Sequence, residues 1–191
     1  MKTQIRFTSL IFLLFFVCQA QAQIPSGEMP AKFVNKIKKV FPTFEKSQTI
    51  QIPDPLTDGA PNSSVWTLWG KKNKHLGFAR EIHTTTGCNM SCLPLHFILV
   101  LDKLKKFKAL IEIDLLTKKN HAPFTDEDRL KLNLILLSPP ASFKKPTQPL
   151  DVIDVITAET KLEYQGDVIK EAALTSFRSY QYLKQTQNSL P

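Results

Sequence analysis

Four side chains that can ligate a metal lie close together near the middle of the chain: His83, Cys88, Cys92 and His96. Thiolate sulfur and imidazole nitrogen are ligands that suit copper or zinc. The Cys-x3-Cys pair also offers two other chemistries, a disulfide that staples the loop and a strained, redox-active pair. A disulfide here requires a non-helical loop, because a helix separates the Cβ atoms of residues i and i+4 by about 5–6 Å and a disulfide needs about 3.5–4.5 Å. At the level of sequence, all three interpretations remain open.

The residues around this cluster follow a pattern of strand, loop and strand. Apolar and polar side chains alternate from residue 76 to residue 83, which predicts a strand. Gly87 and Pro94 suit a loop around the cysteines, and the apolar run Phe97–Leu101 predicts a buried strand after it. The alternating set before the loop is Phe78, Arg80 and Ile82 against Ala79, Glu81 and His83. We expect polar chemistry at the turn and burial beyond it.

Three further segments have the pattern of strands. Val65–Trp69 alternates with aromatic residues, and a basic turn at 70–74 joins it to the central strand, which predicts a hairpin. Residues 49–52 form a short candidate strand before a loop at 53–63 that is rich in Pro, Asp and Gly. The segment 107–113 continues the meander. The sequence therefore predicts a single α+β domain with an antiparallel sheet of about four or more strands, flanked by helices.

One helix is predicted before these strands in the sequence, and another after them. Apolar residues recur at helical spacing from Ala31 to Phe44, with lysines opposite them and Pro42 ending or kinking the helix. A second helix is predicted after Thr125, whose hydroxyl can cap it while Asp128 reaches back to complete a capping box.

The second helix competes with a strand interpretation. Its leucines recur with period two, at residues 130, 132, 134 and 136. The cap and the length favour a helix, which Pro139-Pro140 ends. A Pro- and Lys-rich loop is expected at 139–150, and a last amphipathic helix at 167–185.

The first 22 residues have the pattern of a targeting signal. Lys2 and Arg6 provide a basic start, an apolar run follows at 10–18, and Ala20-Gln21-Ala22 forms a small-x-small cleavage site. The apolar run is shorter than the ~20 residues that a membrane span needs. We expect residues 1–22 to be removed, residues 23–30 to form a leader and residues 31–191 to form the domain. A periplasmic or secreted product with no integral membrane segment is therefore predicted.

The chain is basic, with 25 Lys and Arg residues against 17 Asp and Glu residues. The lysines occur in scattered doublets without interleaved aromatic residues, which is typical of a solvated surface. We therefore expect no nucleic-acid partner, and a mild preference for anionic partners is the alternative. The sequence has no Ser-His-Asp order, carboxylate pair or Gly-rich phosphate loop, so no independent catalytic activity is expected.

A second candidate site lies at residues 151–160, where a short apolar segment ends in hydroxyl residues. Hydroxyls and backbone N–H groups in a turn can hold a phosphate, or can stabilise the turn itself. The segment Asp154-x-Ile156-Thr157-Ala158-Glu159-Thr160 resembles the Asp-x-Val/Ile-Ser/Thr-Gly-Ala-Thr signature of the FMN-binding domain in periplasmic subunits of the Rnf, Nqr and nitrous-oxide-regulator redox systems. The helix end at 39–42, the strand entry at 76–78 and the segment 172–177 resemble other parts of that domain in the same order.

This resemblance implies an accessory electron-transfer or redox-sensing domain that works with a redox partner protein. Thr157 and Thr160 would contact the FMN phosphate, and Asp154, which opens the signature, is the third residue expected to bind the cofactor.

Three departures bear on the cofactor. Ala158 replaces the glycine, Glu159 replaces the alanine, and Leu162 stands where members with covalent FMN have a threonine. Leucine has no oxygen to esterify, so we expect FMN to be held non-covalently, and weakly or not at all. The alternatives are a binding or scaffold domain that has lost its flavin, and a Cys-x3-Cys protein that handles copper or zinc.

Overall fold

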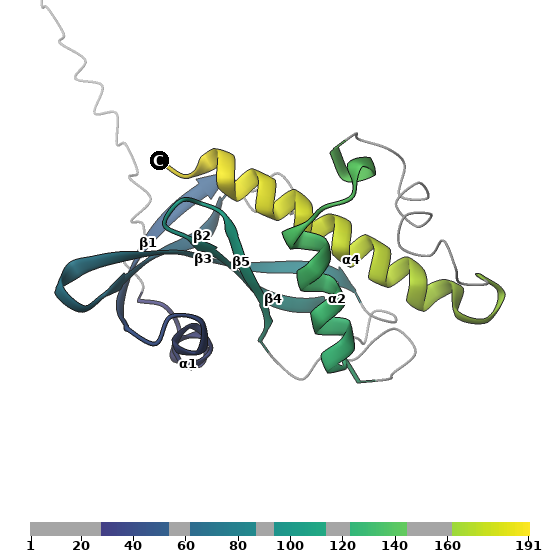
Figure 1. The fold of residues 1–191 in the computed structure, drawn as a ribbon, viewed down its shortest axis with the longest axis horizontal. Coiled ribbons are helices and arrows are strands. Elements are labelled where there is room, and N and C mark those ends of the chain that lie inside the picture. Colours follow the sequence, from purple (N-terminus) through teal and green to yellow (C-terminus); the bar gives the residue numbers. More distant parts are fainter. Residues whose placement is uncertain (1–27, 54–61, 87–93, 114–122, 145–161) are drawn as a thin grey trace, which may run out of the picture.

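The structure, a computed structural model, describes residues 28–53, 62–86, 94–113, 123–144 and 162–191 (Figure 1). In the last range, side chains are described from Leu174 onward. The predicted signal peptide and most of the predicted leader lie outside these residues. The elements in chain order are α1 (Ala31–Val40), β1 (Phe44–Pro53), β2 (Asn62–Gly70), the 3₁₀ turn η1 (Lys71–Asn73), β3 (Lys74–Thr86), β4 (Pro94–Asp102), β5 (Phe107–Glu112), α2 (Asp126–Leu137), the 3₁₀ turn η2 (Ala141–Lys144) and α4 (Leu162–Ser189).

The five strands form one antiparallel sheet in the order β1-β2-β3-β4-β5. Each strand pairs with its neighbour in sequence, so the sheet is a meander. The predicted α+β class is confirmed. The segment expected as a short strand at 49–52 is part of the longer β1, and the predicted loop at 53–63 is too long, since Pro53 and Asn62 pair across the β1–β2 ladder.

Helix α1 ends at Val40, although the helical spacing of apolar residues extends to Phe44. Phe44 opens β1 and pairs with Gly70, so its assignment to the helix is wrong. The physical reason is Pro42, which lacks a backbone N–H and disfavours helical geometry in the residue before it. The predicted effect of Pro42 on the helix is therefore confirmed.

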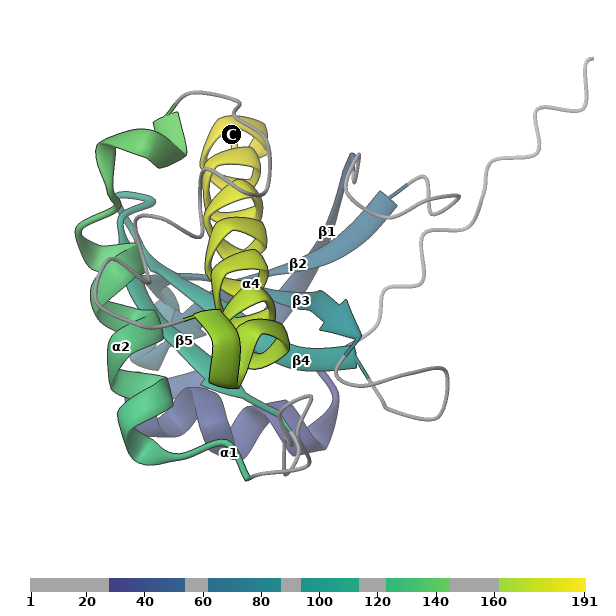
Figure 2. The ribbon, with the colours of Figure 1, turned by 90° about the vertical axis from the view of Figure 1, so that its right-hand side faces the viewer.

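Helices cover both faces of the sheet, as Figures 1 and 2 show. Helix α1 packs on one face with Phe33 and Ile37 fully buried, while α2 and α4 pack on the other. The period of two along each strand sends alternate side chains to the two layers. The α1 layer includes Trp66, Leu68, Ala79, Ile98 and Val100. The opposite layer includes Val65, Phe78, Ile82, Phe97, Leu99, Leu101 and Leu110.

Helix α2 begins with the predicted capping box. The hydroxyl of Thr125 accepts from the backbone N–H of Asp128, and the Asp128 carboxylate accepts from the backbone N–H of Thr125 at 2.8 Å. The period-two leucines arise from two faces of one helix: Leu132 and Leu136 are buried, whereas Leu130 and Leu134 are exposed. The helical prediction is therefore confirmed. The predicted loop after α2 contains η2, and its residues from 145 onward lie outside the described ranges.

The long helix α4 extends beyond the predicted 167–185 at both ends and packs against β3. It covers Arg80, whose guanidinium is fully buried. One guanidinium nitrogen donates to the side-chain oxygens of Gln185, at 2.7 Å, and Thr186, at 2.9 Å. The guanidinium carbon lies 4.8 Å from the ring centroid of Tyr182. Within the described ranges, no helix is both long and apolar enough to cross a bilayer.

Candidate metal centre

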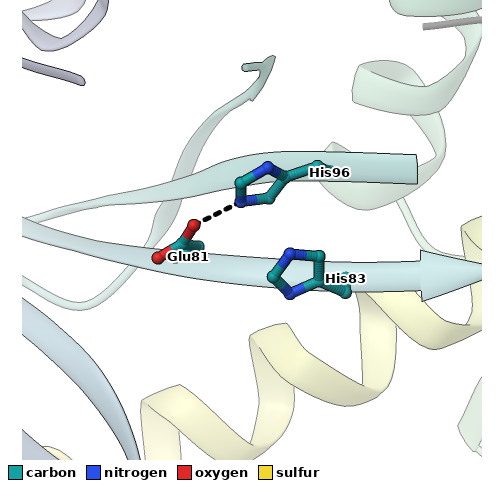
Figure 3. A group of neighbouring side chains, drawn as sticks. All are labelled: Glu81, His83 and His96. Carbon is teal, nitrogen blue, oxygen red and sulfur yellow. Dashed lines mark hydrogen bonds and ion pairs between the residues drawn. The ribbon is translucent and has the colours of Figure 1, made fainter. Parts of the chain in front are cut away.

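Three polar side chains converge on the α1 face of the sheet, near the ends of β3 and β4 that the cysteine loop connects (Figure 3). Glu81 and His83 are two residues apart on β3, so they point to the same face. His96 on β4 is the direct cross-strand partner of His83. Directly opposite residues on one face have neighbouring side chains. The register of a single hairpin thus gathers the group.

The donor atoms are close enough to share one ion. One donor atom from each of Glu81, His83 and His96 lies within 4.8 Å of the other two. Two ligands bound about 2.0–2.1 Å from a tetrahedral zinc ion are themselves about 3.3 Å apart. The widest separation therefore has to close by about 1.5 Å at most, and the contact between Glu81 and His96 has to widen.

The three side chains already contact one another. Nε2 of His96 forms a hydrogen bond and ion pair with Oε1 of Glu81. The rings of His83 and His96 are stacked, with centroids 4.1 Å apart and planes 15° from parallel. The site thus holds its ligands together through contacts that a metal would partly replace.

The cluster is walled on one side and open on the other. The side chain of His96 is only 13% exposed and that of Glu81 is 32% exposed, whereas His83 is on the surface. Phe33 of α1 makes an edge contact with the His96 ring, at 6.2 Å between centroids. Phe33 therefore covers one side of His96, while His83 leaves the cluster exposed to solvent.

Electrostatics keep Glu81 in the form that a metal binds. Burial alone would raise the pKa of Glu81. The hydrogen bond from His96, together with the positive charges of His96, His83 and Lys32, outweighs burial and holds that pKa below its ordinary value. The carboxylate is therefore ionised at neutral pH.

The arrangement supplies two imidazoles and one carboxylate. Zinc sites that exchange or activate a ligand keep three protein donors, two His and one Glu among them, and leave a position open. The same donor set also binds copper and iron. Glu81, His83 and His96 could therefore hold a divalent transition-metal ion with at least one coordination position free.

The structure unites two of the four metal ligands expected from the sequence. His83 and His96 lie together, whereas Cys88 and Cys92 lie at 87–93, outside the described residues. The disulfide, redox and sulfur-ligand interpretations therefore stay predictions. Glu81 was not identified as a ligand from the sequence. Its signal was the Glu-x-His spacing, which places both side chains on one face of a strand.

The other predicted site residues, Asp154, Thr157 and Thr160, also lie outside the described residues. His75, which precedes the predicted strand at 76–83, is already part of the sheet. It belongs to β3, because η1 ends at Asn73, and its ring contacts Trp69 and Phe78 at 5.1 and 4.9 Å between centroids.

No family model, no curated protein and no solved structure matches the chain.

Proposed function

We propose that this protein binds one divalent transition-metal ion, Zn²⁺ or Cu²⁺, through Glu81, His83 and His96. The observation that carries the proposal is the mutual approach of the three donor atoms, all within 4.8 Å of one another. Imidazole selects borderline transition metals over Mg²⁺ and Ca²⁺, which prefer oxygen ligands. The open position and the exposure of His83 suit an ion that is delivered, exchanged or used, as in a metal-handling domain.

Calorimetric titration of the chain with ZnCl₂ tests the proposal. We expect one ion per chain, and competition by acid, because metal ligands must lose their protons before they bind. The variants His83→Ala, His96→Ala and Glu81→Gln should each weaken binding. His75→Gln is the matched control, since His75 lies on the same strand but not in the cluster. Equal loss of binding in the control would reject the site.

The cysteines provide a second test of the ligand set. A Cys88→Ser/Cys92→Ser variant should keep its zinc affinity if the ligands are Glu81, His83 and His96. Substitution by Co²⁺ gives an independent readout, because thiolate ligands add an intense sulfur-to-cobalt charge-transfer band. Loss of binding in the serine variant together with that band in the unmodified chain would show a sulfur site instead.

A second candidate function is non-covalent binding of FMN. The specific observation in its favour is the position of the signature-like segment 154–160, which ends two residues before the first residue of α4. Helix N-termini attract phosphate through free N–H groups and the helix dipole. The resembling segment 172–177 falls within this helix, in the order that the flavin domain implies.

Titration with FMN, followed by flavin fluorescence, tests this second function. Glu159 would repel the phosphate dianion, and Ala158 would hinder close approach of the backbone. We therefore expect a dissociation constant of about 1 μM or weaker, equivalent to about −8 kcal/mol. Glu159→Ala should strengthen binding, whereas Glu127→Ala, on exposed α2, should not. An affinity that neither variant changes would place any bound flavin elsewhere.

A further inference from the structure

One end of the sheet is strongly basic. In an antiparallel meander, alternate connections lie at the same end, so η1, between β2 and β3, and the turn between β4 and β5 share one end of the sheet. In Figure 1 the β2–β3 hairpin forms the left-hand tip of the sheet, and the β4–β5 turn lies beside the C-terminal end of α4. We call these two turns, together with Lys74, which follows η1, the basic end. Its lysines are Lys71, Lys72, Lys74, Lys103, Lys105 and Lys106.

Further lysines add to this charge. Lys38 and Lys39 occupy the last turn of α1, and Lys108 of β5 lies over the ring of Phe41, which follows that turn, at 5.6 Å. Helix α1 contains no acidic residue. The acid in the β4–β5 turn, Asp102, is engaged by the backbone of that turn. The basic end therefore presents a net positive surface.

An exposed leucine stands at the apex of the β4–β5 turn. Leu104 is 64% exposed and lies between Lys103 and Lys105. Oδ1 of Asp102 accepts from the backbone N–H groups of Leu104, at 2.8 Å, and Lys106, at 2.9 Å. These bonds fix the backbone of the turn that carries the exposed Leu104 between two lysines.

The turn is also anchored to the C-terminal end of α4. Nζ of Lys105 donates to the carbonyl of Leu190 at 2.9 Å, and the Gln187 amide donates to the carbonyl of Lys105 at 2.8 Å. Lys105 itself has a positive φ of 61°. A turn fixed at both its base and its middle presents Leu104 at little further cost in conformational entropy.

We propose that the basic end docks this protein on an anionic phospholipid surface, with Leu104 inserted among the headgroups. A small apolar group surrounded by lysines matches the chemistry of a bilayer interface, where anionic headgroups overlie acyl chains. The two turns, residues 71–73 and 103–106, contain no aromatic residue on which a nucleic-acid base could stack. Single-stranded nucleic acid therefore fits this surface less well than lipid does.

Docking in this way sets the orientation of the metal centre. His83 lies nine residues along β3 from Lys74, or about 30 Å at the usual rise of a strand. The cluster of Glu81, His83 and His96 would therefore stand away from the bilayer and stay open to solution. The docking proposal is independent of metal binding.

Co-sedimentation of the chain with lipid vesicles tests the docking. We expect binding to vesicles of phosphatidylcholine mixed with phosphatidylglycerol, little binding to phosphatidylcholine alone, and release by salt as charges are screened. Lys103→Glu/Lys106→Glu should weaken binding about tenfold or more. Leu104→Ser should weaken it severalfold and leave the salt dependence unchanged, because it removes an apolar contact and no charge.

Matched controls come from other exposed positions. Lys131→Glu/Lys144→Glu makes the same change of charge on α2 and η2. Leu130→Ser makes the same substitution as Leu104→Ser at a residue that is 60% exposed. All variants change surface side chains, and unchanged melting temperatures verify that they fold. The proposal would be overturned if the control variants weakened binding equally, or if the chain bound vesicles without anionic lipid. It would also be overturned if the chain bound DNA but not vesicles.

Discussion

Arg80 and Glu81 are neighbours on one strand, yet their charged groups lie on opposite faces of the sheet and differ in burial. Arg80 points under α4, is fully buried and donates to Gln185 and Thr186. Glu81 points to the α1 side and remains about one-third exposed beside His96. The period of two along β3 thus places one charge in the core and the next at an open cluster.

This difference in burial indicates a structural role for Arg80 and a ligand-binding role for the cluster that contains Glu81. A buried cation held by polar partners and an aromatic ring cannot change partners without opening the core. A carboxylate that is about one-third exposed can exchange its hydrogen bond with an imidazole for a bond to an ion without opening the core. Changes at Arg80 should therefore act on stability, and changes at Glu81, His83 and His96 on ligand binding.

The largest effect should come from Arg80. Arg80→Ala leaves a cavity beneath α4 and removes the donor to the partly buried oxygen of Gln185 and the buried oxygen of Thr186, so we expect the free energy of unfolding to fall by about 3 kcal/mol or more. Urea denaturation measures it. Arg80→Met, which fills more of the volume, should lose less than Arg80→Ala. A loss below about 1 kcal/mol for alanine would show that the buried cation adds little.

The next effect concerns zinc. A single-site ligand at about 100 times its Kd stabilises the folded state by about 2.7 kcal/mol. We expect that gain in the unmodified chain, and none in His96→Ala, when thermal unfolding is followed with and without ZnCl₂. His75→Gln should keep the gain. Stabilisation of His96→Ala by zinc would assign the ion to other ligands.

The capping box of α2 provides a comparison for the Arg80 and zinc predictions, because its polar side chains have a purely structural role. Thr125→Ala removes the acceptor for the Asp128 backbone N–H and should cost about 1 kcal/mol of stability. Zinc binding should not change. Thr125→Ser keeps the hydroxyl and serves as the control. An unchanged urea midpoint in the alanine variant would mean that the cap does not stabilise α2 in solution.

The smallest effect is the pH dependence of Glu81. Its pKa is lower in the folded chain than its ordinary value of about 4.3. The ionised carboxylate therefore stabilises the fold above that value, and the contribution is lost as pH falls through the folded pKa. We expect less than about 1 kcal/mol for this partly exposed pair. The stability difference between unmodified chain and Glu81→Gln should shrink with acidification, and a difference that grows would contradict the assignment.

Local chemistry made the helices and the hairpins predictable. Thr125 and Asp128 mark the start of α2, and Pro42 marks the end of α1, because caps and proline act within a few residues. The length of β1 was underestimated, since its pairing with β2 extends the strand through Ser47 and Lys46, which have little intrinsic preference for strands.

The metal cluster depended on register, which sequence alone does not determine. His83 opposes His96 at the end of a regular register that begins with Gly77 opposite Asp102, and the pairing shifts only beyond it, between His83 and Thr86. A slip of one residue would turn His96 to the α4 face. The two histidines could be expected near each other from the short loop between them. Glu81 lies beside the two histidines because this register places all three side chains on the same face of the sheet.

The order of the strands also has a consequence for how the chain reaches its fold. Each ladder of the meander joins neighbours in sequence, so each closes a short loop, which favours early formation. The contact between Arg80 and Thr186 spans 106 residues and must wait for the last helix. We therefore expect the sheet to assemble first and α4 to dock last. Until then, the guanidinium of Arg80 stays in water, and its burial marks the final step of folding.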